Sequence, residues 1–173
     1  MEVSEAIRTR RSVRRYTDEP VDPGVLRRLV EAACWAPTGG NAQAWRFVVV
    51  VAPERMSRLR MVAPGMSGRP PAAIAVCIDR RVAEPSWGVE TDQLAAMDAA
   101  MAAQNILLEA RGDGLGTCVV ASFNAAGLQR LLRLPAHVVP LLLVAVGRAM
   151  ASPNPPARDV DAVCFFEEYR ERP

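Results

Sequence analysis

The feature that most limits how this chain can fold is a long helical pattern over residues 92–111. Its larger apolar side chains recur at helical spacing among many alanines, at Leu94, Met97, Met101 and 106–108. The pattern is apolar over much of the helix circumference, and helices of that kind are usually buried. We therefore expect this helix to lie at the centre of the fold, covered by other elements.

Shorter apolar segments on both sides of this helix predict strands, and the stretches between them predict further helices. Strands are expected at 46–51, 72–78, 115–120 and 138–146, and helices at 3–10, 22–36, 53–61 and 125–132. Asp22-Pro23 is a strong helix start, since Asp caps a helix and Pro suits its first position. The β-branched run at 46–51 is typical of a strand covered on both faces. We expect a loop at 62–71 and irregular structure in the polar stretch 80–91.

Helices that alternate with short buried strands indicate an α+β or α/β fold in which a helical layer covers a sheet. At 173 residues the chain is long enough to bury a core, and it is expected to form one domain, 1–173, without an internal repeat. The Pro-rich extension 151–173 has no core of its own, yet it carries Val163, Phe165, Phe166 and Tyr169. We expect this tail to pack on a partner subunit.

Composition argues against several classes of function. The net charge is only +2, which gives nucleic-acid binding no bulk electrostatic support. All 21 basic residues are arginine, so lysine nucleophiles and Schiff bases are ruled out. His137 is the one histidine and belongs to no cluster of ligand residues, so no metal site is expected. No apolar run reaches the length of a membrane span.

The four cysteines, Cys34, Cys77, Cys118 and Cys164, are widely spaced and form no Cys-x-x-Cys pair. With no signal peptide at the start, we expect reduced thiols in or near the core of a cytoplasmic protein. Cys118 is accordingly expected to be buried and inert rather than catalytic.

Two polar motifs remain to be explained by function. Arg10-Arg11-Ser12-Val13-Arg14-Arg15-Tyr16 places four arginines around one serine, directly after the first expected helix. The second motif, 36–47, contains Gly39-Gly40 and leads into a strand. Guanidinium groups bind phosphate oxygens two at a time, so several of them near a helix end suit a phosphorylated cofactor. The simpler interpretation, solvated surface charge, is favoured for Arg15 and stays open for Arg11.

These motifs, in this order, resemble the FMN-dependent nitroreductase family, whose pattern is Arg-Arg-Ser-x-Arg, then Ala-Pro-Ser-x-x-Asn-x-Gln-Pro-Trp and a strand. Thr38 and Ala44 stand where the family usually has Ser and Pro. The resemblance continues through the helix at 98–108, the strand entry at 114–118, and the segments 131–135, 142–147 and 155–158. It therefore covers almost the whole chain.

The resemblance implies a three-layer, nitroreductase-like α+β fold with a mostly antiparallel central sheet, and a homodimer with exchanged C-terminal tails. Two FMN sites would lie at the subunit boundary, each built from both chains. Carried over by position, the FMN contacts would be Arg10, Arg11, Ser12 and Arg14 from one subunit, Pro37, Thr38, Gly39 and Asn41 from the other, the backbone at Ala121 and Ser122, and Arg158. Arg10 and Arg158 would take the phosphate, and Arg14 would sit near the N1–C2 edge of the ring.

The implied activity is that of an oxidoreductase that takes hydride from NAD(P)H and reduces nitroaromatic, quinone or similar small-molecule acceptors by a ping-pong mechanism. No catalytic acid or base is evident. Two alternatives stay open: a specialised flavin enzyme of the same fold, such as a dehydrogenase or dehalogenase, and a flavin-binding protein without turnover. Residues 62–91 would decide between the enzymes, and their shortness suggests an open substrate site.

Overall fold

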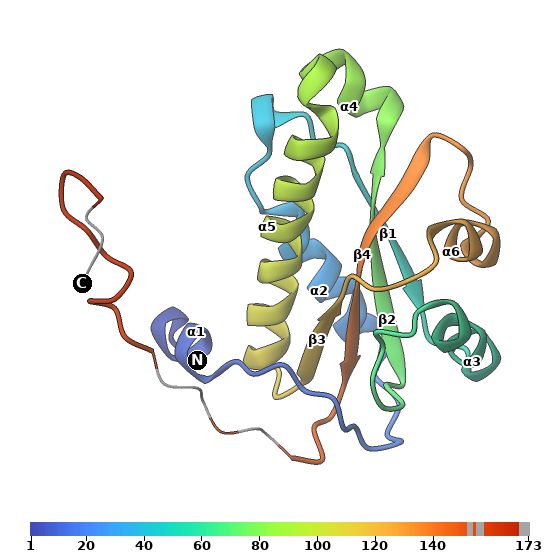
Figure 1. The fold of residues 1–173 in the computed structure, drawn as a ribbon. Coiled ribbons are helices and arrows are strands. Elements are labelled where there is room, and N and C mark those ends of the chain that lie inside the picture. Colours follow the sequence, from blue (N-terminus) through green and yellow to red (C-terminus); the bar gives the residue numbers. More distant parts are fainter. Residues whose placement is uncertain (152–153, 155–157, 170–173) are drawn as a thin grey trace.

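The structure is a computed structural model, and it describes residues 1–151, 154 and 158–169. The first half of the chain forms α1 (Val3–Thr9), α2 (Pro23–Cys34), the 3-10 turn η1 (Gly39–Asn41), β1 (Trp45–Val50), α3 (Pro53–Val62) and β2 (Ala72–Asp79). The second half forms α4 (Arg80–Trp87), η2 (Gly88–Glu90), α5 (Thr91–Gly112), β3 (Gly116–Val120), α6 (Ala125–Leu132) and β4 (Val138–Gly147). Figure 1 shows their arrangement.

Within the described residues, the four strands form one antiparallel sheet in the order β1-β2-β4-β3. Every residue of the central strand β2 is buried. The expectation that 46–51 is covered on both faces is wrong, because β1 lies at an edge of the sheet. Val49 is 40% exposed there, and Val51, just beyond the strand, is 45% exposed. The place of a strand in the sheet, which its composition does not determine, decides how far it is covered.

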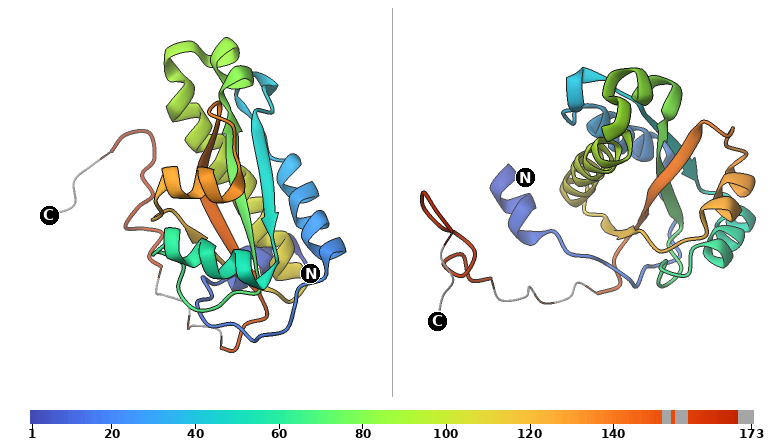
Figure 2. Two further views of the ribbon diagram at one scale, coloured as in Figure 1. Left: turned by 90° about the vertical axis from the view of Figure 1, so that its right-hand side faces the viewer. Right: turned by 45° about the horizontal axis from the view of Figure 1, so that its top comes forward.

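Helices cover both faces of the sheet, which confirms the expected α+β fold (Figures 1 and 2). α2 and α5 lie on one face, where Leu26, Leu29 and Ile106 contribute to the core. α3 and α6 lie on the other face, over a second core that includes Leu59 and Leu128. The sheet is thus the middle of three layers, and both of its faces are used to bury apolar side chains.

α5 is the central helix, as predicted, but one side of it stays open. Ala99 and Ala102 are fully buried, whereas Met97 and Met101 are 49% and 37% exposed. Positions four residues apart lie on the same face of a helix, so the two methionines form a stripe. Trp35, which follows α2, is 82% exposed. Large apolar side chains in such a position are typical of a surface that another molecule covers.

Residues 80–91 are not irregular, as their polar composition suggested, but form α4, η2 and the first residue of α5. Asp79 caps the new helix: its side chain accepts the Arg81 N–H at 3.1 Å and pairs with Arg46 at 3.2 Å. Burial opposes ionisation of Asp79, but the hydrogen bonds from Arg81 and the charges of Arg81 and Arg46 outweigh it and lower the pKa. The cap stabilises a helix that the sequence pattern did not indicate.

Residues 158–169 of the tail lie to one side of the sheet and of the helices that cover it (Figure 2). Val163 and Phe166 are 76% and 87% exposed, and the rings of Phe165 and Tyr169 contact each other with centroids 4.8 Å apart. Residues 155–157, part of the expected late basic segment, lie outside the described residues. The apolar side chains of the tail therefore stay largely exposed in the single chain.

Cys77 and Cys118 are buried, whereas Cys34 and Cys164 are exposed, which corrects the expectation that all four thiols lie in or near the core. Burial raises the pKa of the Cys77 thiol to about 12, so this thiol stays protonated at neutral pH. The described residues contain no group of side chains arranged to hold a metal ion. None of their helices is both long and apolar enough to cross a membrane.

Candidate cofactor-binding site

Residues 10–16, here called the arginine segment, run beside β3. Ser12 forms a parallel bridge with Thr117, and the Val13 N–H donates to the Thr117 carbonyl at 2.8 Å. Val13 is buried against Gly116, where a Cβ would lie only 2.7 Å from Val13 Cγ2. The missing side chain at Gly116 is therefore what lets the arginine segment come this close to the strand.

The guanidinium groups of the arginine segment have no counter-charge within the described residues. Arg10 and Arg14 take part in none of the ion pairs there, and Arg11 Nη1 donates to two main-chain carbonyls at 2.7 Å. Arg111, in the last turn of α5, donates from Nε to Thr9 Oγ1 at 3.0 Å. Arg10, Arg11 and Arg111 line one small pocket of about 80 Å³. Unpaired guanidinium groups around a small pocket suit a phosphate.

The loop between α3 and β2 contacts both Arg14 and the residues that directly follow β3. Gly68 packs on the Arg14 carbonyl, and a Cβ at Gly68 would lie 2.3 Å from that oxygen. The Gly65 N–H donates to the Ser122 carbonyl at 3.1 Å. Ala121 and Ser122 are both exposed, so their backbone is open to a ligand. The structure thus gathers the arginine segment and the predicted backbone contacts around one loop.

Residues 37–41, here called the glycine loop, have a strained backbone. Gly40, Asn41 and the following Gln43 have φ of 56°, 55° and 52°, a region that residues other than glycine rarely adopt. Thr38 Oγ1 accepts the Gln43 N–H at 3.2 Å, and Asn41 Oδ1 accepts from Gln43 Nε2 at 2.9 Å. Strained conformations persist only where the surroundings hold them, and they cluster at binding sites.

Two side chains from other elements hold the backbone of Gly39 in the glycine loop. Trp87 Nε1–H, at the end of α4, donates to the Gly39 carbonyl at 2.9 Å. Asp98 Oδ1, on α5, accepts the Gly39 N–H at 3.3 Å. Asp98 is only 2% exposed, and its Oδ2 has no hydrogen-bond partner within the described residues. Burial raises the pKa of Asp98, and the hydrogen bond from Gly39 partly opposes this shift.

A single chain does not bring the two groups of predicted cofactor contacts, the arginine segment and the glycine loop, together. Asp98, which holds the glycine loop, and Arg111, which lies beside the arginine segment, are both on α5. At 1.5 Å per residue they are roughly 20 Å apart along the helix axis. Figure 1 shows the glycine loop near α4 and the arginine segment at the opposite end of α5. Arg158 is exposed on the tail.

The sequence did not indicate the part that three residues play in this site: Asp98, Arg111 and Trp87, of which only Trp87 was considered at all, as a possible substrate-pocket residue. An acidic residue on the alanine-rich, buried face of a helix is a usable signal, because burying a charge is costly unless it has a partner. That signal points to Asp98. Nothing in the sequence pattern distinguishes Trp87 or Arg111 from ordinary core or surface residues, since only the fold brings them to the two groups.

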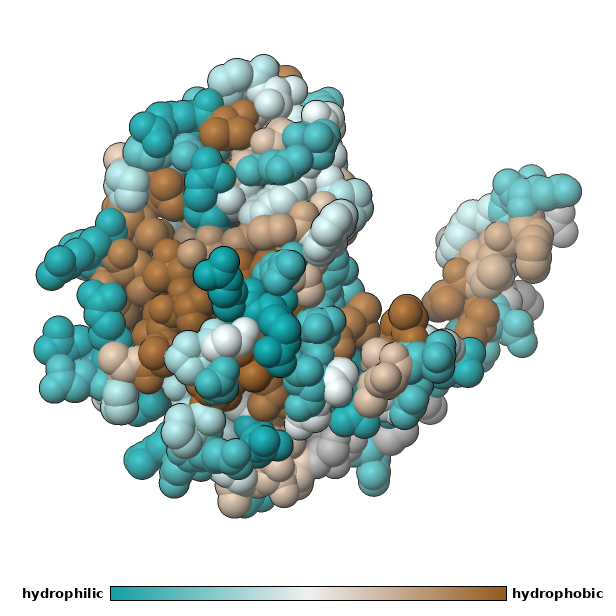
Figure 3. All heavy atoms as spheres, turned by 180° about the vertical axis from the view of Figure 1, so that it is seen from behind, coloured by the Kyte–Doolittle hydropathy of each residue, from teal (hydrophilic) through white to brown (hydrophobic). Residues whose placement is uncertain are grey.

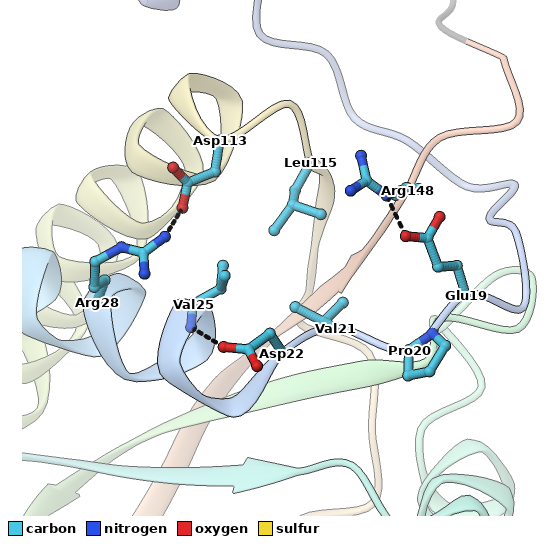
Figure 4. Close-up of a pocket in the computed structure, with 9 residues that line it drawn as sticks. All are labelled: Glu19, Pro20, Val21, Asp22, Val25, Arg28, Asp113, Leu115 and Arg148. Carbon is cyan, nitrogen blue, oxygen red and sulfur yellow. Dashed lines mark hydrogen bonds and ion pairs between the residues drawn. The ribbon is translucent and has the colours of Figure 1, made fainter.

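A larger pocket of about 270 Å³ lies where α2, the end of α5 and the end of β4 meet (Figure 4). Its arginines are already neutralised: Arg28 pairs with Asp113 at 2.9 Å, and Arg148 pairs with Glu19 at 2.8 Å. Val21, Val25 and Leu115 form its apolar part. Because both guanidinium groups are already paired with carboxylates, this pocket is a weaker candidate for binding an anion than the small pocket beside the arginine segment.

Comparison with known proteins gives consistent relatives. The model of the nitroreductase family matches residues 7–75 and 65–148. A proposed NADH dehydrogenase/NAD(P)H nitroreductase of Methanothermobacter thermautotrophicus is 33% identical over 167 residues, which cover 92% of this chain and 83% of that protein. An NAD(P)H-type FMN reductase of Bacillus subtilis is 30% identical over 185 residues, which cover 97% of this chain and 74% of that protein.

Solved structures share the fold. A nitroreductase family protein of Clostridium difficile superimposes with a TM-score of 0.86 at 26% identity, covering 98% of this chain and 100% of that one. The NfrA1 protein of Bacillus megaterium gives a TM-score of 0.88 at 27% identity, covering 98% of this chain and 76% of that one. The three-layer arrangement described above is therefore the arrangement of these proteins as well.

Proposed function

The chain belongs to the nitroreductase family of NAD(P)H nitroreductases and FMN reductases, and we propose that it binds FMN and passes hydride from NAD(P)H to nitroaromatic, quinone or similar acceptors in a ping-pong cycle. The proposal goes beyond family membership in naming the cofactor, the acceptors and the order of the two half-reactions. It is supported by how the chain distributes its charges.

The unneutralised arginines carry this proposal. Arg10, Arg11 and Arg111 line a small pocket and have no acidic partner within the described residues. A phosphate placed among them would receive charge-assisted hydrogen bonds, each worth about 1.5–3 kcal/mol. The chain has no Gly-x-Gly-x-x-Gly loop for a pyrophosphate, so the monophosphate FMN suits it better than FAD.

When bound, FMN would supply the hydride chemistry, and the chain would supply position and charge. The residues that would hold it are Arg10, Arg11, Ser12, Arg14 and Arg158, the backbone of Ala121 and Ser122, and, from the partner, Pro37, Thr38, Gly39 and Asn41. Arg10 and Arg158 would take the phosphate. Arg14 would place a positive charge where negative charge develops on the reduced ring. The backbone of Ala121 and Ser122 would orient the N5 and O4 edge.

Each site needs two chains under this proposal. In one chain the glycine loop and the arginine segment lie beside α5 residues that are roughly 20 Å apart along the helix axis. One chain therefore supplies only one half of any single site. A twofold-related pair of chains can place the glycine loop of one beside the arginine segment of the other. The open stripe of Met97 and Met101, with the exposed Trp35, offers the apolar surface that such a pair would bury.

An exchange of C-terminal tails between the two chains would stabilise the same dimer. β1 has an unpaired outer edge within the described chain, and Val49 and Val51 are exposed beside it. Figure 3 shows apolar side chains gathered in a hollow on the back face of the molecule and again along the tail. A tail that crosses to the partner would bury Val163 and Phe166, which have no cover in their own chain.

The first test is the identity of the bound flavin. Purified protein should absorb in the visible range, and heat denaturation should release FMN that chromatography separates from FAD. Release of FAD, or a colourless protein that takes up no FMN, would contradict the proposal. Steady-state NADH and NADPH oxidation with a quinone then separates an oxidoreductase from a flavin-binding protein without turnover.

A mixing experiment tests the two-chain site. Arg10→Ala damages the arginine segment, and Gly39→Val damages the glycine loop, because its side chain would meet Trp87. Each variant alone should bind FMN poorly. Refolding them together should give mixed dimers in which one site is intact, so part of the FMN binding returns. If the mixture binds no more FMN than the separate variants, the two groups serve the same chain and the dimeric site is wrong.

A further inference from the structure

Asp98 is an unusual side chain for its position on α5. Its neighbours Ala95, Ala99 and Ala102 are buried and small, and Asp98 itself is 2% exposed. A carboxylate in such surroundings loses its hydration, which is costly unless hydrogen bonds replace it. Only Oδ1 has such a bond, from the Gly39 N–H, while Oδ2 is buried without a partner among the described residues. Core packing alone does not call for this residue.

The backbone of Gly39 is held at both of its polar groups, the N–H and the carbonyl. Asp98 accepts its N–H at 3.3 Å, and Trp87 Nε1–H donates to its carbonyl at 2.9 Å. A Cβ at Gly39 would lie 3.1 Å from Trp87 Nε1, a tight contact, so the missing side chain leaves room for the indole beside the carbonyl. The residues that follow, Gly40 and Asn41, have positive φ. The hold is thus applied directly before the strained part of the glycine loop.

We propose that Asp98 and Trp87 are positioning residues that clamp the backbone of Gly39 and thereby fix the direction in which the glycine loop faces the cofactor. This inference rests on the proposed function, because it concerns the loop that would contact FMN from the partner chain. Neither residue needs to touch the cofactor. Each acts through the Gly39 backbone group that it holds.

The physical gain from such a clamp is pre-organisation. A loop with positive φ at Asn41 and Gln43 would relax to ordinary backbone conformations if it were not held. FMN would then have to select the competent fraction of loop conformations, and its apparent affinity would fall by that fraction. The clamp removes this penalty in advance, since the loop is ordered before the ligand arrives.

The carboxyl group makes one half of the clamp sensitive to protonation. The pKa of Asp98 is raised by burial and lowered by the Gly39 N–H, and no charged side chain of α2, α4 or α5 contributes to the shift. An ionised carboxylate accepts a hydrogen bond more strongly than a protonated one. The hold on Gly39 should therefore weaken as the pH falls through the raised pKa. Trp87 does not titrate, so its half of the clamp is independent of pH.

The experiment measures FMN affinity against pH for Asp98→Asn, Trp87→Phe and the unchanged protein. Asp98→Asn keeps an acceptor oxygen but cannot ionise, so FMN should bind about five- to tenfold more weakly at neutral pH, the difference between a charged and a neutral hydrogen bond. In the unchanged protein the affinity for FMN should decline as the pH falls through the pKa of Asp98, and in Asp98→Asn this decline should be absent. Trp87→Phe should weaken binding about two- to tenfold and keep the decline. The double variant should lose less than the sum of the two single losses, because both residues hold the backbone of the same residue, Gly39.

Asn105→Ala is the matched control. Asn105 lies two turns further along α5, and its Nδ2 donates to the Ala32 carbonyl at 3.0 Å. The variant removes a comparable hydrogen bond to the backbone of α2 but leaves the glycine loop untouched. Its affinity for FMN and the pH profile should match those of the unchanged protein when both are dimeric.

A second measurement needs no cofactor. In flavin-free, nitrogen-15-labelled protein, the Gly39 amide resonance should shift with pH as Asp98 titrates, and that titration should vanish in Asp98→Asn. If FMN binds but Asp98→Asn alters neither the affinity profile nor the Gly39 amide, the clamp is wrong and the proposed function stands. If the unchanged protein binds no FMN while Gly39 titrates with Asp98, the proposed function fails and the hydrogen bond alone remains.

Discussion

Val13 occupies the space in which a side chain at position 116 would stand, because a Cβ on Gly116 would lie 2.7 Å from Val13 Cγ2 and 2.9 Å from Val13 Cβ. This contact fixes the arginine segment against β3, together with the Val13–Thr117 hydrogen bond. The charged residues on either side of Val13 therefore depend on one apolar anchor. The position of the guanidinium groups can be tested without changing any of them.

Gly116→Ala should displace Val13 and with it the arginine segment. Overpacking of this kind costs about 1–3 kcal/mol of stability, and FMN affinity should fall as well because Arg10 and Arg11 shift. The measurements are urea unfolding and an FMN titration. Gly112→Ala is the control, since no atom lies within 4 Å of a Cβ at that helical position. Equal behaviour of the two variants would mean that the anchor does not matter.

Arg10→Ala should weaken FMN binding by about 1.5–3 kcal/mol, the usual worth of a charge-assisted contact. The matched variant Arg148→Ala removes an arginine that pairs with Glu19 and lines a different pocket. It should leave FMN affinity unchanged, because an exposed ion pair contributes little. Fluorescence quenching of free FMN would give both dissociation constants. A similar loss in both variants would indicate a general charge effect instead of a phosphate site.

Arg14→Gln should tune the flavin more than it weakens its binding. Removing the charge disfavours the reduced, anionic ring, so the midpoint potential should fall by roughly 20–60 mV, which corresponds to about 1–3 kcal/mol for a two-electron couple. Hydride transfer from NAD(P)H should slow in parallel. A dye-equilibration titration measures the potential, with Arg15→Gln as the control. An unchanged potential with ready loss of FMN would place Arg14 at the phosphate.

Asp79 should make the fold less stable in acid. Its pKa is lowered in the folded state, mainly by Arg81 and Arg46 against the cost of burial. A lowered carboxyl pKa stabilises the fold fully above the ordinary aspartate value of about 3.9, and this contribution is lost as the pH falls through the lowered value. Asp79→Asn should therefore cost about 1–3 kcal/mol at pH 7 and progressively less below pH 4.

The control for this pH dependence is Asp92→Asn, because Asp92 pairs with Arg80 but is 82% exposed. Its effect on stability should be small at every pH, as for most exposed ion pairs. Urea midpoints between pH 3 and pH 7 measure all three proteins. A constant difference between Asp79→Asn and the unchanged protein across that range would show that Asp79 acts only through packing.

Deletion of the residues after Arg158 should abolish dimerisation and FMN binding together, because the exposed apolar side chains of the tail are expected to land on the partner. Size-exclusion chromatography with light scattering gives the mass, and the visible spectrum gives the flavin content. A shortened chain that remains dimeric and yellow would show that the tail is dispensable for both.

Local signals predicted the fold well where local interactions decide it. Asp22-Pro23 does start α2, with Asp22 Oδ1 accepting the Gly24 and Val25 N–H groups, and α6 matches the expected helix at 125–132. The helix at α4 was missed because its cap, Asp79, is stabilised by Arg46 from another strand. The exposure of β1 was misjudged because strand order is a property of the whole sheet.

The candidate site divides in the same way. Its two motifs are contiguous in sequence and could be recognised there, whereas the residues that hold them come from far along the chain. Trp87 and Asp98 reach Gly39 across 48 and 59 positions, and Arg111 reaches Thr9 across 102. A short-range sequence pattern can mark Asp98 as a buried charge that needs a partner, but it does not show which residue that partner is. Whether the glycine loop of one chain meets the arginine segment of another likewise depends on the surface through which two chains would pair, and no sequence motif describes that surface.

The separation of the two groups along α5 has a consequence for the protein in dilute solution. A flavin that contacts both chains would couple cofactor binding to dimerisation. FMN would then raise the affinity of the two chains for each other, and dimerisation would raise the affinity for FMN by the same factor. Specific activity should then fall on dilution, as the assembled fraction of the protein falls, and recover when FMN is added in excess. The supply of FMN would set how much of the protein exists as assembled enzyme.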